Sequence, residues 1–223
     1  MKPISHELIS QLPKVELHCH LDGSLRINSI LDIAKKEGIK LPSYNLESLR
    51  PYLKAGKKRG TLEDYIKRFD ITLSVMQTPK SLKRIAYELI EDVAKENVRY
   101  IEVRYSPILH TQRGMTLNTA IESVQKGLKK GEKQYGVKSG IIICGIRHIS
   151  PEKSLILADL AVRYKNKGVV GFDLAGAEEN FPAKEHREAF YLIRNNNINA
   201  TIHAGEAFGP SSIHQAIHQC GAN

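Results

Sequence analysis

Five short apolar runs recur along the 223-residue chain with helical patterns between them, and this alternation constrains the fold more than any other feature. Three of the runs are almost continuously apolar, which is typical of strands buried on both faces of a parallel sheet. The expected strands cover residues 15–21, 98–105, 140–146, 168–174 and 199–203. Strands that alternate with helices predict an α/β fold in which crossover helices join parallel strands.

Apolar residues at helical spacing mark the connections between these strands. The expected helices cover residues 82–93, 117–128, 156–164 and 213–220. The first connection is by far the longest, and it holds a Lys-, Gly- and Pro-rich stretch at 35–60 and a helix near 62–76. An insertion after a barrel strand can cap the active-site face, so we expect a helical cap at about residues 28–78 of a single domain spanning 1–223.

Composition and segment lengths exclude several classes of protein. Hydrophobic residues make up 41% and charged residues 26% of the chain, close to the globular average, so disorder is not expected. No apolar run approaches the roughly 18 residues of a membrane span, and the N-terminal residues lack the apolar core of a signal peptide. The three cysteines are widely spaced and form no disulfide framework. We therefore expect a cytoplasmic protein with no membrane partner.

The formal net charge of +9 leaves a polyanion partner open. The basic run at 54–60 is able to bind phosphate, but such a run more often forms a solvated surface loop, which we favour. No helix-turn-helix, RRM or zinc-finger spacing accompanies the charge, so we expect no nucleic-acid partner.

The segment His18-Cys19-His20 is the strongest local signal, at the end of the first expected strand. Residues two apart on a strand point to the same face, so His18 and His20 share a face while Cys19 points away into the core. Two imidazoles side by side make half of a zinc site, because zinc suits nitrogen ligands. Two polar strand-end histidines without a metal explain this motif alone equally well.

A second histidine motif closes the fifth expected strand, where Glu206 follows His203 on the same side as His18 and His20. A histidine near a carboxylate that is not a ligand is typical of hydrolytic zinc sites, where the metal acidifies a water and the carboxylate moves its proton. A simpler interpretation is that Glu206 stabilises the N-terminus of a helix. The two motifs together favour the zinc interpretation.

The fourth expected strand closes with Asp173-Leu174-Ala175-Gly176-Ala177-Glu178. Gly176 lets the backbone approach a ligand closely, so that its amide could donate to a planar base. A plain strand-to-loop turn is the alternative, and this segment on its own favours it.

Five segments in order closely resemble the adenosine deaminase family of metal-dependent hydrolases. They cover residues 13–26, 62–78, 100–110, 168–178 and 200–210. The resemblance implies a TIM (β/α)8 barrel whose zinc-dependent hydrolysis converts adenosine and 2′-deoxyadenosine to inosine and 2′-deoxyinosine plus ammonia, a step of purine metabolism.

The resemblance also implies a role for each site residue. The implied ligands of one Zn2+ ion per chain are His18, His20 and His203. His20 and Asp22 are expected beside the substrate, with Asp22 on the ribose. Gly176 is implied to hydrogen-bond the purine, and Glu206 to donate a proton to the purine ring.

The chain departs from the family pattern in two ways. Ala177 stands where the family commonly has an aspartate, and only about five of the eight βα units have counterparts here. The family segments that carry a further histidine and two adjacent aspartates are absent, which leaves three of four protein zinc ligands. We interpret the chain as a portion of a longer enzyme. A shortened gene product and a five-strand protein completed by oligomerisation are the alternatives, and open barrel edges favour self-association.

A purine nucleoside is the expected small-molecule partner, because the carboxylate of Asp22 suits a hydroxyl and repels a 5′-phosphate. Adenine and N6-substituted AMP are alternative substrates. A catalytically weak or inactive remnant that binds purine or zinc is the alternative to an enzyme.

Overall fold

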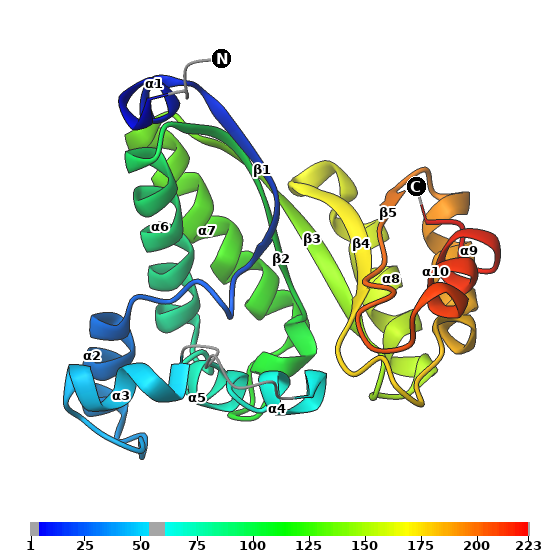
Figure 1. Cartoon of the computed structure of the whole chain (residues 1–223), viewed down its shortest axis with the longest axis horizontal. Helices are drawn as coiled ribbons and strands as arrows, with labels where there is room; N and C mark the ends of the chain where they lie inside the picture. Colours follow the sequence, from blue (N-terminus) through cyan, green and yellow to red (C-terminus); the bar gives the residue numbers. More distant parts are fainter. Residues whose placement is uncertain (1–4, 54–60, 223) are drawn as a thin grey trace.

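The computed structural model describes residues 5–53 and 61–222. Its centre is a parallel sheet of five strands in the order β1-β2-β3-β4-β5 (Figure 1). The strands are β1 (Lys14–His20), β2 (Val98–Tyr105), β3 (Lys138–Ile146), β4 (Val169–Ala175) and β5 (Asn199–Ala200). Each strand pairs with its neighbour in the sequence, which is the arrangement of consecutive βα units in a TIM barrel. The predicted α/β fold with five units is confirmed.

The fifth strand is shorter than the predicted 199–203, because only Asn199 and Ala200 form the ladder with β4. The chain nevertheless stays beside β4 beyond this point. The backbone N–H of Thr201 donates to Phe172 O at 2.9 Å, and that of His203 donates to Leu174 O at 3.1 Å. His203 is therefore held at the end of the sheet by β4.

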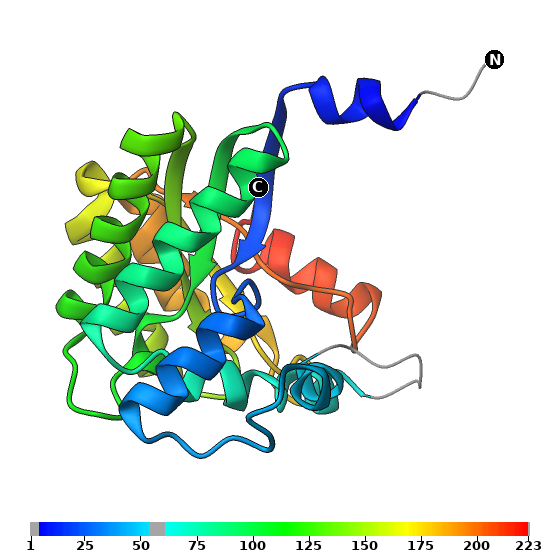
Figure 2. The ribbon, with the colours of Figure 1, turned by 90° about the vertical axis from the view of Figure 1, so that its left-hand side faces the viewer.

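Four long helices cover one face of the sheet, and the chain crosses between strands through them (Figures 1 and 2). They are α6 (Pro79–Lys95), α7 (Leu117–Tyr135), α8 (Pro151–Tyr164) and α9 (Arg187–Asn195), followed by α10 (Pro210–His218) after β5. Among the described residues, short 3-10 turns lie in the connections between strands and helices. They are η1 (Pro107–His110), η2 (Lys165–Lys167) and η3 (Ala183–His186). Helix α9 was not among the predicted helices, although its Ala189, Phe190 and Ile193 form a buried apolar face.

The connection after β1 is helical, with α2 (Ile27–Glu37), α3 (Leu46–Leu53), α4 (Leu62–Ile66) and α5 (Phe69–Ser74) at one end of the sheet (Figure 1). The helix predicted near 62–76 is thus two short helices, separated at Lys67 and Arg68. The basic run at 54–60 lies outside the described residues.

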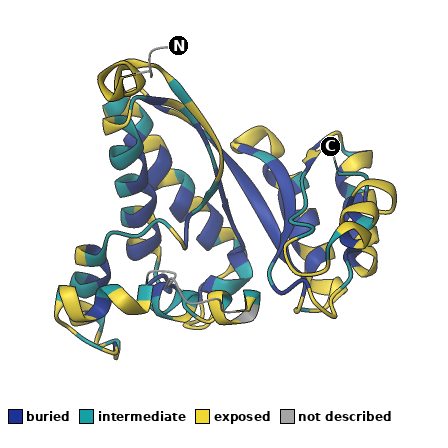
Figure 3. Ribbon diagram, in the orientation of Figure 1, coloured by how far each residue is buried: buried dark blue, intermediate teal, exposed yellow. Residues whose placement is uncertain are grey.

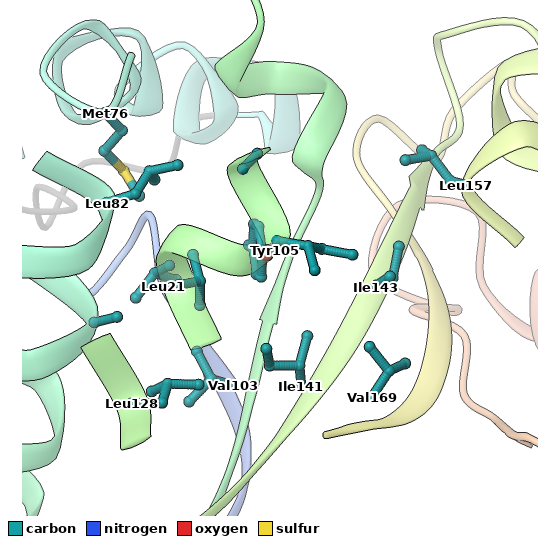
Figure 4. Packing of buried hydrophobic residues seen from close by; sticks show 14 of the residues in the cluster. Leu21, Met76, Leu82, Val103, Tyr105, Leu128, Ile141, Ile143, Leu157 and Val169 are labelled. Carbon is teal, nitrogen blue, oxygen red and sulfur yellow. The ribbon is translucent and has the colours of Figure 1, made fainter. Parts of the chain in front are cut away.

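Alternating strand residues divide the sheet into a face that packs against the helices and an opposite face that carries a buried ion pair among apolar side chains. Val103, Ile141 and Ile143 belong to the core between the sheet and the helices, where Leu128 of α7 and Leu157 of α8 also lie (Figure 4). Figure 3 shows β3, at the centre of the sheet, as largely buried. Arg104 and Asp173 have the opposite parity along their strands and lie on the other face. The core therefore positions the opposite face, which carries the site.

Helices α6 and α7 pack closely because α7 has glycines where α6 crosses it. A Cβ on Gly131 would lie 2.6 Å from the Cβ of Ile90, closer than real side-chain atoms approach.

The N-terminal helix α1 (His6–Gln11) has no buried residue and projects from the rest of the chain in Figure 2. Within the described residues, no helix has the length and apolar character needed to cross a bilayer.

The sheet-to-helix core predicts a large loss of stability for Phe172→Ala. Phe172 is fully buried, and its ring packs edge-on against that of Phe190, with centroids 5.3 Å apart. Truncation of such a ring leaves a cavity and lowers the free energy of unfolding by about 3–5 kcal/mol in urea denaturation. The matched control is Tyr191→Ala, because Tyr191 is 66% exposed on the same helix as Phe190 and its loss should cost under about 0.5 kcal/mol. Similar losses for both variants would contradict this packing.

Candidate active site

Three histidine side chains converge at the carboxyl ends of the strands. His18 and His20 come from β1, and His203 follows β5. The Nε2 atom of His203 lies 2.9 Å from Nε2 of His18 and 3.0 Å from Nε2 of His20. One nitrogen from each ring falls within a cluster less than 4.8 Å across. The structure thus brings together the three residues that the sequence predicts as ligands.

An irregularity in β1 helps to aim these rings. The pairing of β1 with β2 shifts between Glu16 and Cys19, where β1 holds one residue more than its partner, as in a β-bulge. The backbone N–H of His18 donates to the carboxylate of Glu16 at 2.9 Å instead of pairing with β2. Cys19 lies outside the histidine cluster and packs against the core, with its Sγ 3.3 Å from Ser24 Oγ.

The carboxylate of Asp173 orients the third histidine. Asp173 is fully buried on β4, and its Oδ2 lies 2.9 Å from Nδ1 of His203. Arg104 on β2 donates to the same oxygen at 3.0 Å and to the backbone carbonyl of Leu17 at 2.8 Å. A carboxylate on Nδ1 leaves Nε2 directed at the metal position, which is a usual arrangement behind metal-bound histidines.

The electrostatics of the cluster favour the neutral form of the two β1 imidazoles. Burial lowers the pKa of His18, and burial with the neighbouring His203 lowers that of His20 to about 4. Burial opposes charge on His203 too, but the hydrogen bond and charge of Asp173 outweigh it and raise the pKa of His203. Burial would raise the pKa of Asp173, yet its bonds to His203 and Arg104 hold it at about 2. The lowered pKa values favour the metal-binding, unprotonated form of His18 and His20, while Asp173 supports the imidazole of His203 from its other nitrogen.

These three residues fit a zinc ion. Zinc takes histidine nitrogens at about 2.0–2.1 Å, so nitrogens about 3 Å apart can share one ion. Neutral imidazole is the ligand form that zinc requires, and three histidines with a fourth, open position form a known catalytic zinc set. The donor set is all nitrogen, which suits zinc better than calcium or magnesium.

A cavity of about 590 Å³ opens over the histidines. Apolar residues of the cap cover one side of it: Leu62, Tyr65, Ile66, Phe69 and Leu73. All six predicted site residues border the cavity: His18, His20, Asp22, Gly176, His203 and Glu206. Their positions are thus compatible with a single site, and their individual roles remain predictions.

The three non-histidine residues differ in their surroundings. Asp22 is buried, its Oδ1 has no hydrogen-bond partner among the described residues, and burial raises its pKa to about 6. Gly176 has φ +97°, and a Cβ there would lie 2.9 Å from Nδ1 of His148, so no other residue fits without a shift. Glu206 is exposed to solvent at the rim of the cavity, in the loop before α10.

Sequence patterns missed three supporting residues. Arg104 and Asp173 belong to strands 69 positions apart, and Glu178 binds the loop that carries Glu206. The sequence signal for Asp173 is a charged residue inside an otherwise apolar strand, which requires a buried partner. Arg104 shares its strand with Arg99 and Glu102 and so does not stand out.

Fold and site together define a class of protein: a parallel βα fold of the TIM-barrel type with three histidines placed to hold a metal ion at the carboxyl ends of its strands. Comparisons with known proteins make the class more specific. The sequence profile described as adenosine deaminase matches residues 13–223. The chain therefore belongs to the adenosine deaminase family.

The curated relatives include proteins from bacteria and an amoeba. An adenosine deaminase from Clostridium perfringens is 44% identical over 211 residues, which is 95% of this chain and 64% of that protein. A probable adenosine deaminase from Dictyostelium discoideum is 41% identical over 222 residues, covering 100% of this chain and 29% of that protein. The chain thus spans less than two thirds of the length of these relatives.

Solved structures share the fold. An adenine deaminase from Arthrobacter aurescens superposes with a TM-score of 0.84 at 25% identity, covering 93% of this chain and 62% of that chain. The N6-mAMP deaminase of Arabidopsis superposes with a TM-score of 0.80 at 28% identity, covering 93% of this chain and 63% of that chain. A zinc-bound amidohydrolase from Burkholderia ambifaria superposes with a TM-score of 0.86 at 23% identity, covering 99% of this chain and 60% of that chain.

The histidine cluster predicts that His18→Ala abolishes stoichiometric metal binding. Two nitrogens are too few for a stable zinc site, so zinc content after dialysis should fall from about one per chain to near zero in elemental analysis. His214→Ala is the control, because His214 is exposed on α10 and lies outside the cluster. Retention of one zinc by the His18→Ala chain would contradict the ligand assignment.

Proposed function

We propose that this chain carries the metal-binding part of an active site for zinc-dependent deamination of adenosine and 2′-deoxyadenosine, which yields inosine or 2′-deoxyinosine and ammonia. One observation carries the proposal: His18, His20 and His203 converge beneath a cavity that Glu206 also borders. The relatives named adenosine deaminase support it.

The residues around the cavity would divide the work. Zinc, when bound, would supply Lewis-acid chemistry that lowers the pKa of water, so that hydroxide is available to add to C6 of the purine at neutral pH. Glu206 would give a proton to ring nitrogen N1 as electrons move into the ring, and the new C6 hydroxyl would return a proton to Glu206. The proton lost by the water would end on the amino group, which leaves as ammonia. Asp22 would accept a hydrogen bond from a ribose hydroxyl, since its Oδ1 accepts none from the described residues and lies 3.9 Å from Nδ1 of His20. The apolar cap residues would exclude water from the purine.

Two other substrates deserve a direct test, because solved relatives are an adenine deaminase and an N6-mAMP deaminase. When the buried carboxyl of Asp22 is ionised, it repels the negative charge of a phosphate and so favours a neutral hydroxyl. The competing function is a purine- or zinc-binding segment without turnover.

We also propose a cytoplasmic setting. The proposal rests on the three free cysteines, of which Cys144 and Cys220 are buried.

The proposal predicts that Glu206→Gln abolishes turnover and leaves zinc bound. Glutamine keeps the shape of glutamate but has no proton to donate at N1, so the rate should fall by about 10²–10⁴-fold. Chromatography of products from adenosine, adenine, AMP and N6-methyl-AMP measures both rate and substrate. Turnover of AMP-type substrates alone, or loss of zinc in the variant, would contradict the assignment. Zinc binding by the wild-type chain with no turnover would favour the non-catalytic alternative.

We further propose that two copies of the chain associate through β1. Its outer edge has no strand partner among the described residues, and Val15 and Leu17 are 61% and 53% exposed there. Unpaired edges of this kind bind other strands.

Light scattering after size exclusion should therefore give a mass that rises from 25.0 kDa towards twice that value with concentration. The double variant Val15→Lys/Leu17→Lys should stay monomeric, whereas Leu155→Lys, at an exposed position of α8, should still associate. A wild-type chain that remains monomeric at every concentration would contradict this proposal.

A further inference from the structure

The loop that carries Glu206 is held by a carboxylate that the proposed reaction does not use. Glu178 follows β4 and is only 4% exposed. Its Oε1 accepts the backbone N–H of Gly205 at 2.6 Å, and its Oε2 accepts that of Phe208 at 3.0 Å. The backbone N–H of Ala207 donates to the same Oε2. One side chain therefore satisfies three backbone donors of a single loop.

These three donors flank Glu206 on both sides. Gly205 precedes it, and Ala207 and Phe208 follow it, so these hydrogen bonds hold the backbone around Glu206 while its own side chain is exposed and borders the cavity. Gly205 has φ +89°, a conformation that other residues rarely adopt, and a Cβ there would lie 2.9 Å from Cδ1 of Ile213. The loop conformation thus depends on a glycine and on Glu178.

A buried arginine holds the other end of the same loop. Arg147, which is 2% exposed, donates to the backbone carbonyl of His203 and, at 2.9 Å, to that of Phe181. The anionic Glu178 accepts hydrogen bonds from the N–H groups of the loop, and the cationic Arg147 donates one to a carbonyl group at its start. Both ends of the segment between the third histidine and α10 are therefore tied to the loops after β3 and β4.

The carboxylate has to be ionised to do this. A carboxylate accepts hydrogen bonds at both oxygens, whereas glutamine has one accepting oxygen and an NH2 group that would face backbone N–H donors. Burial alone would raise the pKa of Glu178, but the Ser212 hydroxyl and the backbone N–H groups of Ala207, Gly205 and Phe208 outweigh burial and lower the pKa to about 2. The same contacts that hold the loop therefore favour the ionised carboxylate.

We propose that Glu178 is the positioning residue for Glu206: its carboxylate binds the backbone of residues 205–208 and so fixes where Glu206 meets a bound purine. The structural part stands on the hydrogen bonds alone, and the catalytic part rests on the proposed deamination. Neighbouring Glu179 is exposed and supplies a matched control at the next position of the chain.

Hydrogen exchange measured by mass spectrometry tests the structural part on the zinc-loaded chain. Glu178→Gln should speed exchange of the 205–208 amides by about tenfold or more, because each lost bond of this kind is worth roughly that factor. Peptides from β3 and β4 should be unchanged, and Glu179→Gln should match the wild type throughout.

Three outcomes would overturn the proposal. The first is wild-type exchange in the Glu178→Gln chain, because an isosteric side chain would then suffice and packing alone would explain the burial. The second is faster exchange across the strands as well, and the third is a variant that fails to fold. In either of these cases Glu178 would support the whole fold instead of one loop.

Kinetics test the catalytic part. Glu178→Gln should lower kcat for adenosine by up to about a hundredfold, since small misplacement of a catalytic group has costs of that size. KM and zinc content should stay close to those of the wild type. A rise in KM at constant kcat would overturn the positioning of Glu206. If the wild-type chain turns over no purine, the proposed function fails while the exchange experiment still decides the role of Glu178.

Discussion

The buried carboxylate of Asp173 is the interaction on which the sheet and the site both depend. It lies on β4 and binds Arg104 from β2 and His203 beyond β5, so one side chain connects three strands. A charge at that depth is strongly destabilising unless it is paired, and removing either partner leaves an uncompensated ion. The alignment of the strands and the orientation of the third histidine are therefore coupled.

The rest of the site is built outward from this network, and each layer comes from a different part of the chain. Imidazoles at the strand ends line one side of the cavity, and apolar cap residues line another. The loop after His203 carries Glu206 at the rim of the cavity. Glu178 and Arg147 hold that loop from two neighbouring connections. Membership of the adenosine deaminase family accounts for the shared fold, while the chain spans 64% of its Clostridium perfringens relative.

Local patterns in the sequence predicted the parts that local physics determines. The strand-like runs placed β1 to β4 within two residues. Burial on both faces explains the apolar runs of β3 and β4, whereas most of β1 is exposed. They failed for β5, whose ladder stops after Ala200, and for the nine-residue helix α9, whose apolar face is too short to stand out. Alternation predicted that His18 and His20 meet. Nothing local could predict that Asp173 pairs with Arg104, or that Glu178 binds a loop 27 to 30 positions away.

The central claim is that one zinc ion binds the three histidine nitrogens at the strand ends. X-ray absorption at the zinc edge of the metal-loaded chain tests it most directly, because it measures ligand type and distance around the ion. The account predicts imidazole scattering from three nitrogens at about 2.0–2.1 Å and no sulfur. A sulfur ligand at about 2.3 Å would bring Cys19 into the site, and fewer than three imidazoles would remove one of the histidines. Either result would contradict the account.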